Sequence, residues 1–292
     1  MNQPTSSIPL ISVIIPCHNS AEYISETLDS LLASTWKNFE VLAIDDASSD
    51  NTVDILRSYQ QRDNRIHIIE QKQNTYCVIA RQNAISHAKG EYLVCLDSDD
   101  KLAPTYLEKC VSAAEQDKSL SIVYTDGMLF GRKNDPWKIP EFAPRQFLMH
   151  CSIYVSALIR KSDFDAVGGF DTSLTLCEDW ELFISIIKNG GKVHRIHEPL
   201  FFYRQRLDHS SASDIGYQFK ERLSDNIFHI YSKHYDFYKQ HHIYFSDIWD
   251  CQNKIVKMYK RYYLYSLRRF FYQWFKPKKY QEIIQIVKGG GL

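Results

Sequence analysis

The most informative part of the sequence is the segment Asp97–Asp100, which directly follows the apolar run Tyr92–Leu96. In an extended segment, side chains at alternate positions point the same way, so the carboxylates of Asp97 and Asp99 can converge. Two carboxylates held together repel each other unless a cation lies between them. Such hard oxygen ligands suit Mg²⁺ or Mn²⁺, which bind through one or two carboxylates and the phosphates of a substrate. This segment, which we call the aspartate loop, therefore predicts a site for a metal ion and a diphosphate.

A second acidic pair, Asp45-Asp46, follows another apolar run, Phe39–Ile44. Taken alone, the pair is equally typical of a turn that leads into a helix cap. In an open parallel sheet, however, ligands bind outside the carboxyl ends of the strands, where both acidic loops would lie. Together, the two loops favour a ligand site in which the first contacts a nucleobase or ribose and the second holds the metal.

The elements that must position these loops alternate along the first half of the chain. Apolar runs predict strands at residues 10–15, 39–44, 65–70 and 92–96, and amphipathic segments between them predict helices. Ser20 is the expected cap of the first helix, and Pro104 is expected to open the helix after the aspartate loop. This alternation predicts an α/β protein with a mostly parallel sheet and helices on both faces.

The pattern changes in the second half. Residues 126–177 combine short strands, loops and a Gly168-Gly169 turn, and a helix is expected at residues 178–188. From about residue 213 onward the sequence is helical, aromatic and basic. The length of 292 residues fits one large domain with an extension.

The charge balance, the cysteines and the longest apolar runs limit what kind of protein this can be. The 35 basic and 35 acidic residues cancel, so net charge indicates no partner. The seven cysteines are odd in number and scattered, which favours core thiols in a reducing compartment. We find no signal peptide and no run near the ~20 apolar residues of a membrane-spanning helix. We therefore expect a soluble protein or one that lies on a membrane surface.

Five segments, in order and at family spacing, resemble an inverting family 2 glycosyltransferase with the GT-A fold. They cover roughly residues 10–205 and comprise Val13–Asn19, Ala43–Asp50, Ala80–Ala84, Lys89–Tyr92 with Leu96–Asp100, and Gly168–Asp171 followed by Cys177–Trp180. The resemblance implies a Rossmann-like, mostly parallel sheet flanked by helices, with a helical C-terminal extension. We expect a catalytic domain at residues 1–212, with a nucleotide-binding half at about 10–125 and an acceptor half at about 126–212. The extension would cover residues 213–292.

The resemblance also implies a donor site in the first half. Pro16 and Asn19 would line the pocket for base and ribose. Asp46 would accept a hydrogen bond from the base, for which uracil is the expected identity. Arg81 would approach the base or the phosphates.

For the aspartate loop, the resemblance implies a different role for each of its three aspartates. Asp99 would ligate Mn²⁺ or Mg²⁺ directly, and Asp97 would reach the ribose or a metal-bound water. Asp100 would orient the loop or cap the next helix. A divalent ion on the diphosphate neutralises the charge of the leaving group, as a Lewis acid does.

Glu178-Asp179-Trp180 supplies the candidate for the remaining step, removal of the proton from the acceptor hydroxyl. Alone, the two acids are typical of the first turn of a helix, where the dipole favours them. The resemblance implies that Asp179 is the catalytic base and that Glu178 positions the acceptor or the loop. We expect the helix N-terminus to keep Asp179 ionised.

The segment Tyr203–Ser211 departs from the family pattern Tyr-Arg-x-His-x-x-Ser, because Arg206 stands at the usual histidine position. Either Arg204 and Arg206 grip the diphosphate as fixed cations, or His209 reaches the metal along a different path. We prefer the arginines, because a lone histidine is more often not a ligand.

The C-terminal segment at residues 254–280 is rich in lysine, arginine and aromatic residues, with no acid between 254 and 279. Contact with an anionic membrane surface is the preferred interpretation. The alternatives are a packed helix pair and a nucleic-acid patch, and no nucleic-acid motif accompanies the segment. Surface attachment fits an acceptor carried on a lipid.

These observations predict a metal-dependent inverting transfer of a hexose or N-acetylhexosamine from a UDP-sugar to a hydroxyl of a lipid-linked glycan. The expected setting is cell-envelope polysaccharide or lipopolysaccharide synthesis at the cytoplasmic face of the inner membrane. A sugar nucleotidyltransferase would need a glycine-rich loop after the first strand, which the sequence lacks. An inactive scaffold that recruits partner transferases is a further alternative, opposed by the presence of Asp97, Asp99 and Asp179.

Overall fold

The computed structural model describes residues 8–208, 219–247 and 277–278. The chain divides into two compact units, Met1–Phe237 and Tyr238–Leu292. The expected domain boundary between residues 212 and 213 lies outside the described residues. So does the basic aromatic segment at 254–280, apart from Pro277 and Lys278.

In the described part of the first unit, nine strands form one mixed sheet with the order β3-β2-β1-β4-β8-β6-β9-β5, and β7 pairs with β6. Strands β1 to β4 are parallel, β8 runs antiparallel to β4 and β6, and β6 and β9 are parallel again. The bounds are β1 Ile11–Cys17, β2 Phe39–Asp45, β3 Ile66–Glu70, β4 Tyr92–Cys95, β5 Lys101–Leu102, β6 Leu120–Gly131, β7 Pro136–Trp137, β8 Leu158–Arg160 and β9 Lys192–Gln205.

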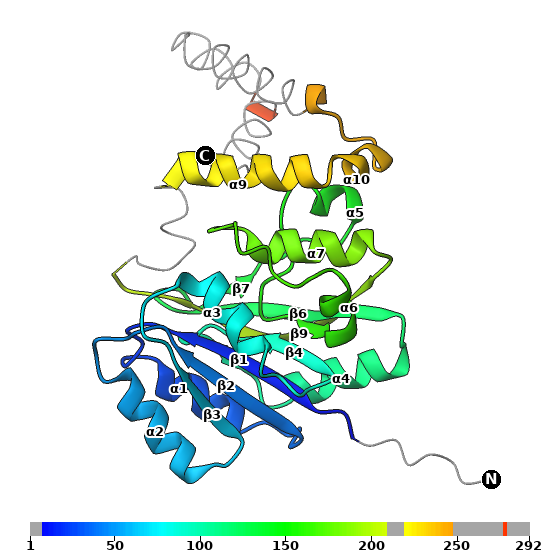
Figure 1. Cartoon of the computed structure of the whole chain (residues 1–292). Coiled ribbons are helices and arrows are strands. Elements are labelled where there is room, and N and C mark those ends of the chain that lie inside the picture. The colour runs from blue at the N-terminus through cyan, green and yellow to red at the C-terminus, as the bar shows by residue number, and fades with distance from the viewer. Residues whose placement is uncertain (1–7, 209–218, 248–276, 279–292) are drawn as a thin grey trace, which may run out of the picture. The chain divides into compact units, whose positions relative to one another are not determined.

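Helices cover both faces of this sheet (Figure 1). Helices α1, α2 and α4 lie on one face, and α3, α6 and α7 lie on the other. Their bounds are α1 Ile24–Leu32, α2 Thr52–Arg62, α3 Tyr76–Ile85, α4 Tyr106–Gln116, α5 Pro144–Phe147, α6 Lys161–Ala166, α7 Glu178–Lys188, α9 Lys220–Lys233 and α10 Tyr235–Gln240. The predicted α/β class, with a sheet between helices and helices toward the C-terminus, is confirmed.

The predicted strands of the first half are confirmed as β1 to β4, and the helix expected at residues 178–188 is α7. Every residue of β1 and β2 is buried, as expected for central strands covered on both faces. The expected cap at Ser20 is wrong, because α1 begins at Ile24 and its N-cap is Tyr23. The Ser20 hydroxyl instead lies 2.7 Å from the hydroxyl of Ser98, where it serves the aspartate loop.

The connection from β4 to β5 determines where the aspartate loop lies. Strand β4 pairs with β1 and β8 near the middle of the sheet, whereas β5 pairs with β9 at its edge. The loop must therefore cross the carboxyl end of the sheet, and its far end is joined to β9. Among the helices of the described residues, none is long and apolar enough to span a membrane.

Candidate active site

A cavity of about 800 Å³ lies at the carboxyl ends of β1, β2 and β4. Its lining brings together predicted residues from both acidic loops, from α3, from the start of α7 and from the end of β9. These are Pro16, Asp46, Arg81, Asp97, Asp99, Glu178, Asp179 and Arg206. Asn19 and Arg204 do not line this cavity, and His209 lies outside the described residues.

The aspartate loop is fixed from one side by the segment around α1. The hydroxyl of Ser98 pairs with that of Ser20, and the Thr27 hydroxyl donates to the Ser98 carbonyl at 2.9 Å. From the other side, the backbone N–H of Arg204 donates to the buried carboxylate of Asp100 at 2.8 Å. Burial and the neighbouring aspartates raise the pKa of Asp100 well above its usual range. Asp100 thus orients the loop, which is one of the two roles expected for it.

Asp97 and Asp99 lie close enough to influence each other. Burial and then the charge of Asp97 raise the pKa of Asp99, although the Arg206 guanidinium donates to Asp99 Oδ2 at 2.8 Å. A divalent cation would relieve this repulsion, so the donor set fits Mg²⁺ or Mn²⁺. Within residues 8–208, 219–247 and 277–278, no cluster of three metal-ligating side chains exists. Two carboxylates alone suit an ion that takes other ligands from a diphosphate and water.

Arg81 holds the two acidic parts of the site together. Its buried guanidinium donates to Asp97 Oδ1 at 2.6 Å and to Glu178 Oε1 at 2.5 Å. The side chain comes from α3, so this residue connects the aspartate loop to the first turn of α7. In this structure two carboxylates accept hydrogen bonds from the guanidinium, whereas the resemblance implied a place near the base or the phosphates.

Asp179 follows Glu178 in the first turn of α7 and is half-buried. Its carboxylate accepts a hydrogen bond from the Trp180 backbone N–H at 2.7 Å. Burial first, and then the charge of Glu178, raise the pKa of Asp179 to about 7. We expected the helix N-terminus to keep this carboxyl ionised, but desolvation and a like charge outweigh the dipole. A pKa near 7 suits a general base that works near neutral pH.

The turn that delivers these acids places Cys177 in the left-handed region, with φ of 61°. A residue with a Cβ is uncommon there, and such conformations gather at functional sites. The strained residue is therefore the N-cap of α7, directly before Glu178 and Asp179.

In the first acidic loop, Asp45 stabilises a turn and Asp46 lines the cavity. Asp45 accepts the Ser48 backbone N–H at 3.1 Å, which is the turn role. Asp46 lines the cavity, and its Oδ1 accepts from the backbone and hydroxyl of Thr75 at 2.8 and 3.0 Å and from Gln71 at 2.9 Å. The carboxylate is therefore oriented before any ligand arrives.

Asn19 serves the frame of the same region. Its backbone is left-handed, with φ of 50°, and its side-chain oxygen accepts the Ser49 N–H at 2.8 Å. The Ser48 hydroxyl accepts the Asn19 backbone N–H at 2.9 Å. Asn19 therefore ties the loop after β1 to the loop after β2, and Pro16 lines the cavity beside them.

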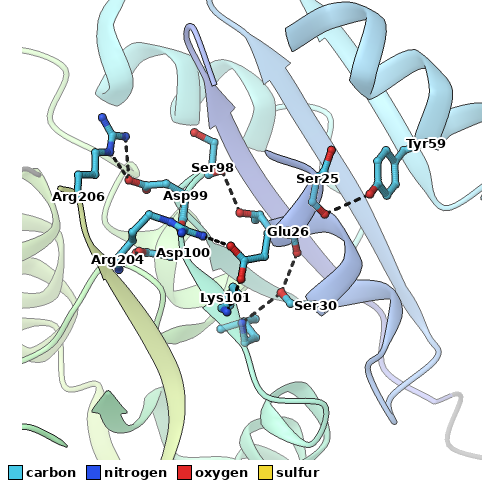
Figure 2. Close-up of polar contacts among 12 residues, drawn as sticks. Ser25, Glu26, Ser30, Tyr59, Ser98, Asp99, Asp100, Lys101, Arg204 and Arg206 are labelled. Carbon is cyan, nitrogen blue, oxygen red and sulfur yellow. Dashed lines mark hydrogen bonds and ion pairs between the residues drawn. The ribbon is translucent and has the colours of Figure 1, made fainter. Parts of the chain in front are cut away.

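The two arginines at the end of β9 have different surroundings, which Figure 2 shows. Arg206 lines the cavity and pairs with Asp99, whereas Arg204 donates to the Asp99 carbonyl at 2.7 Å and forms an ion pair with Glu26. Lys101 pairs with the same Glu26 at 2.5 Å. Arg204 thus supports the aspartate loop from outside the cavity.

The partners of these two arginines at the start of α1 were not predicted from the sequence. Tyr23 lies beneath both guanidiniums, with ring-to-carbon distances of 4.8 Å to Arg204 and 5.2 Å to Arg206. Glu26 lies on α1 and Tyr23 is the N-cap of that helix, so both are remote from β9 in sequence and only folding brings them to it. The sequence offers one local sign of cations near the acidic loop, because Lys101 directly follows Asp100.

Comparison with known proteins gives consistent matches. The family model described as glycosyl transferase family 2 matches residues 12–168. TuaG of Bacillus subtilis, a glycosyltransferase assigned to teichuronic acid biosynthesis, is 30% identical over 200 residues, covering 67% of this chain and 79% of TuaG.

Solved structures show the same fold. S. aureus TarS 1–349 in complex with UDP-GlcNAc aligns with a TM-score of 0.60 at 22% identity, over 67% of this chain and 58% of that one. The mannosyltransferase PcManGT of Pyrobaculum calidifontis, in complex with GDP-Man and Mn²⁺, aligns with a TM-score of 0.58 at 20% identity. That alignment covers 78% of this chain and 64% of PcManGT. The present chain therefore spans less than two thirds of either solved protein.

Proposed function

Because the chain belongs to glycosyl transferase family 2 and has the GT-A fold, we propose that it transfers a hexose or N-acetylhexosamine from a UDP-sugar to a glycan hydroxyl. The anomeric centre would invert. The coarser conclusion, a nucleotide-sugar glycosyltransferase of polysaccharide biosynthesis, follows from the family and from relatives such as TuaG. UDP as the donor nucleotide is supported by the ligand of TarS, while PcManGT binds GDP-Man.

One observation carries the proposal most directly. The aspartate loop and Asp179 line the same cavity, and Arg81 binds a carboxylate on each side. Asp99 and Asp97 would hold Mn²⁺ or Mg²⁺. The solved structure of PcManGT contains Mn²⁺ together with GDP-Man. When bound, the ion neutralises charge on the diphosphate as it leaves. Asp179 takes the proton from the acceptor hydroxyl, and burial together with the charge of Glu178 keeps the pKa of Asp179 high enough for that task.

The remaining site residues complete the donor pocket in this proposal. Pro16 and the oriented carboxylate of Asp46 would receive the uridine, with Asn19 holding their loops in place. Arg206 supplies a fixed cation to the diphosphate at the family's histidine position. Its place on the cavity wall supports the arginine alternative over His209. Arg204 supports the loop from behind instead.

We also propose the setting of the reaction from the sequence beyond the described residues. Catalysis would belong to residues 1–212, and residues 213–292 would form an extension whose basic aromatic segment at 254–280 contacts an anionic membrane surface. A lipid-linked saccharide at the cytoplasmic face of the inner membrane is the matching acceptor, as in envelope polysaccharide or lipopolysaccharide synthesis. No nucleic acid takes part.

A thermal-shift screen of nucleotide sugars with and without Mn²⁺ identifies the donor and the metal requirement together. Asp99→Asn should abolish the Mn²⁺-dependent shift, whereas Asp179→Asn should bind the donor and lose turnover about 100-fold or more. Asp54→Asn is the matched control, because that carboxylate lies on α2 with 80% of its side chain exposed.

Full turnover in both Asp99→Asn and Asp179→Asn contradicts the proposal. A wild-type protein that binds donor but neither hydrolyses nor transfers it with Mn²⁺ would favour the inactive scaffold.

A further inference from the structure

Four aromatic rings form a continuous strip beside the aspartate loop. Trp137 of β7, Tyr154, and Phe201 and Tyr203 of β9 all line the cavity that contains Asp179. Trp137 lies 5.0 Å from Tyr203 and 6.0 Å from Tyr154 between ring centroids, and Tyr154 stacks on Phe201 at 4.1 Å. Nothing in the proposed donor chemistry uses this strip.

The register of three neighbouring strands explains how the strip is built. Gly127 of β6 pairs with Phe201 on one side and with Trp137 on the other. Because the middle residue has no side chain, the two rings approach to 6.1 Å across it. A Cβ on Gly127 would meet Trp137 Cε3 at 3.0 Å, so this glycine sets the height of the indole above the sheet.

Burial separates the strip into a base and an outer surface. Phe201 and Tyr154 are 1% and 8% exposed, and the Tyr154 hydroxyl is engaged with Thr125. Trp137 and Tyr203 are only half-buried. The inner rings therefore support the outer two, which lie on strands β7 and β9 and present aromatic surface to the cavity.

The position of the strip decides what it can receive. In the sheet, β4 and β8 separate β6, β7 and β9 from β1 and β2, whose ends carry the proposed nucleotide pocket. An aromatic face on this far side is available to a ligand other than the uridine. Pyranose rings offer one apolar face of C–H groups that packs on an aromatic ring, while their hydroxyls stay at the polar rim.

We propose that Trp137 and Tyr203 form a stacking platform for a pyranose ring of the acceptor, placing its hydroxyl in the cavity with Asp179. This inference rests on the proposed function and specifies its acceptor: a saccharide ring lies in the site, not only the lipid that carries it. Trp137 is a binding residue in this scheme, and Gly127 is a positioning residue that acts through it.

The test uses saturation-transfer NMR on the full chain with UDP and Mg²⁺. The probes are methyl pyranosides of glucose, galactose, mannose and N-acetylglucosamine, and sorbitol is the probe with hydroxyls but no ring. We expect at least one pyranoside to receive saturation, strongest at the C–H protons of one ring face, and sorbitol to receive none.

The variants separate stacking from general damage to the fold. Trp137→Ala should reduce the saturation signal about tenfold, the order expected when an aromatic contact is lost. Gly127→Ala should reduce it less, by displacing the indole, and Trp137→Phe should retain most of it. Trp36→Ala is the matched control, since Trp36 does not line the cavity. UDP affinity, measured by calorimetry, should be the same in all four variants.

Two results would overturn the platform: no saturation of any pyranoside, or equal signals from Trp137→Ala and Trp36→Ala. Failure of the proposed function would look different. A protein that holds a pyranoside through Trp137 but does not bind UDP contradicts the UDP-sugar donor and supports the platform.

Discussion

The raised pKa of Asp179 makes a prediction about stability that needs no knowledge of the substrate. Burial and Glu178 move this pKa from 3.8 to about 7 in the folded chain, while the unfolded chain keeps the ordinary value. Between these two values the folded state binds the additional proton. Stability therefore falls as pH rises from about 4 to 8, and the whole contribution is lost above the folded pKa.

The size of this effect follows from the shift. About 3 pKa units correspond to about 4 kcal/mol at 1.36 kcal/mol per unit. Because part of the Asp179 carboxyl reaches the cavity, we expect about half of that, roughly 2 kcal/mol. Asp179→Asn cannot titrate, so its stability relative to wild type should improve by this amount between pH 4 and pH 8.

Urea unfolding of wild type and Asp179→Asn at pH 4, 6 and 8 measures the difference directly. Asp54→Asn, on the exposed face of α2, should show no such trend. A wild-type to Asp179→Asn difference that stays constant across the three pH values would refute the reasoning, because it would mean that the site does not hold this proton.

Other consequences concern catalysis and ligands. Glu178→Gln removes the charge that, after burial, most raises the pKa of Asp179, so the acidic limb of the kcat/KM profile should move toward lower pH. An unmoved limb would assign that limb to another group. Arg81→Lys keeps the positive charge, but an ammonium group cannot bind Asp97 and Glu178 through two separate nitrogens as the guanidinium does. In a transfer assay, kcat should therefore fall about 100-fold, with little change in folding. Chelation with EDTA should remove most of the thermal shift caused by UDP, and an undiminished shift would show that the nucleotide binds without metal.

The sequence predicted the frame of this site well because its signals are local. The apolar runs at 39–44 and 92–96 are the buried strands β2 and β4, and the helix predicted at 178–188 begins and ends where expected. Parallel strands carry their ligands at one edge, so the order of strands and loops along the chain was enough to bring the two acidic loops together.

The relations among side chains could not be read in this way. Arg81 lines the cavity and binds Asp97 and Glu178, two contacts that the sequence did not predict, because no spacing rule indicates a contact across 97 residues of sequence. The pKa of Asp179 depends on burial, which the pattern around a helix start does not reveal. The aromatic strip depends on a glycine opposite two rings on different strands, and register over such distances follows from the folded sheet alone.

The clamp between the aspartate loop and β9 has a consequence for how the chain acquires its activity. On the β9 side, the contacts that fix the loop join Asp100 to Arg204 and Asp99 to Arg206, pairs separated by 104 and 107 residues. During synthesis the aspartates leave the ribosome long before these partners exist, and contacts of such long range form late in folding. Until β9 has been made, the aspartate loop therefore has only its contacts with Ser20 and Thr27 to hold it. Only a chain that includes the end of β9 can hold the carboxylates of Asp99 and Asp100 from both sides.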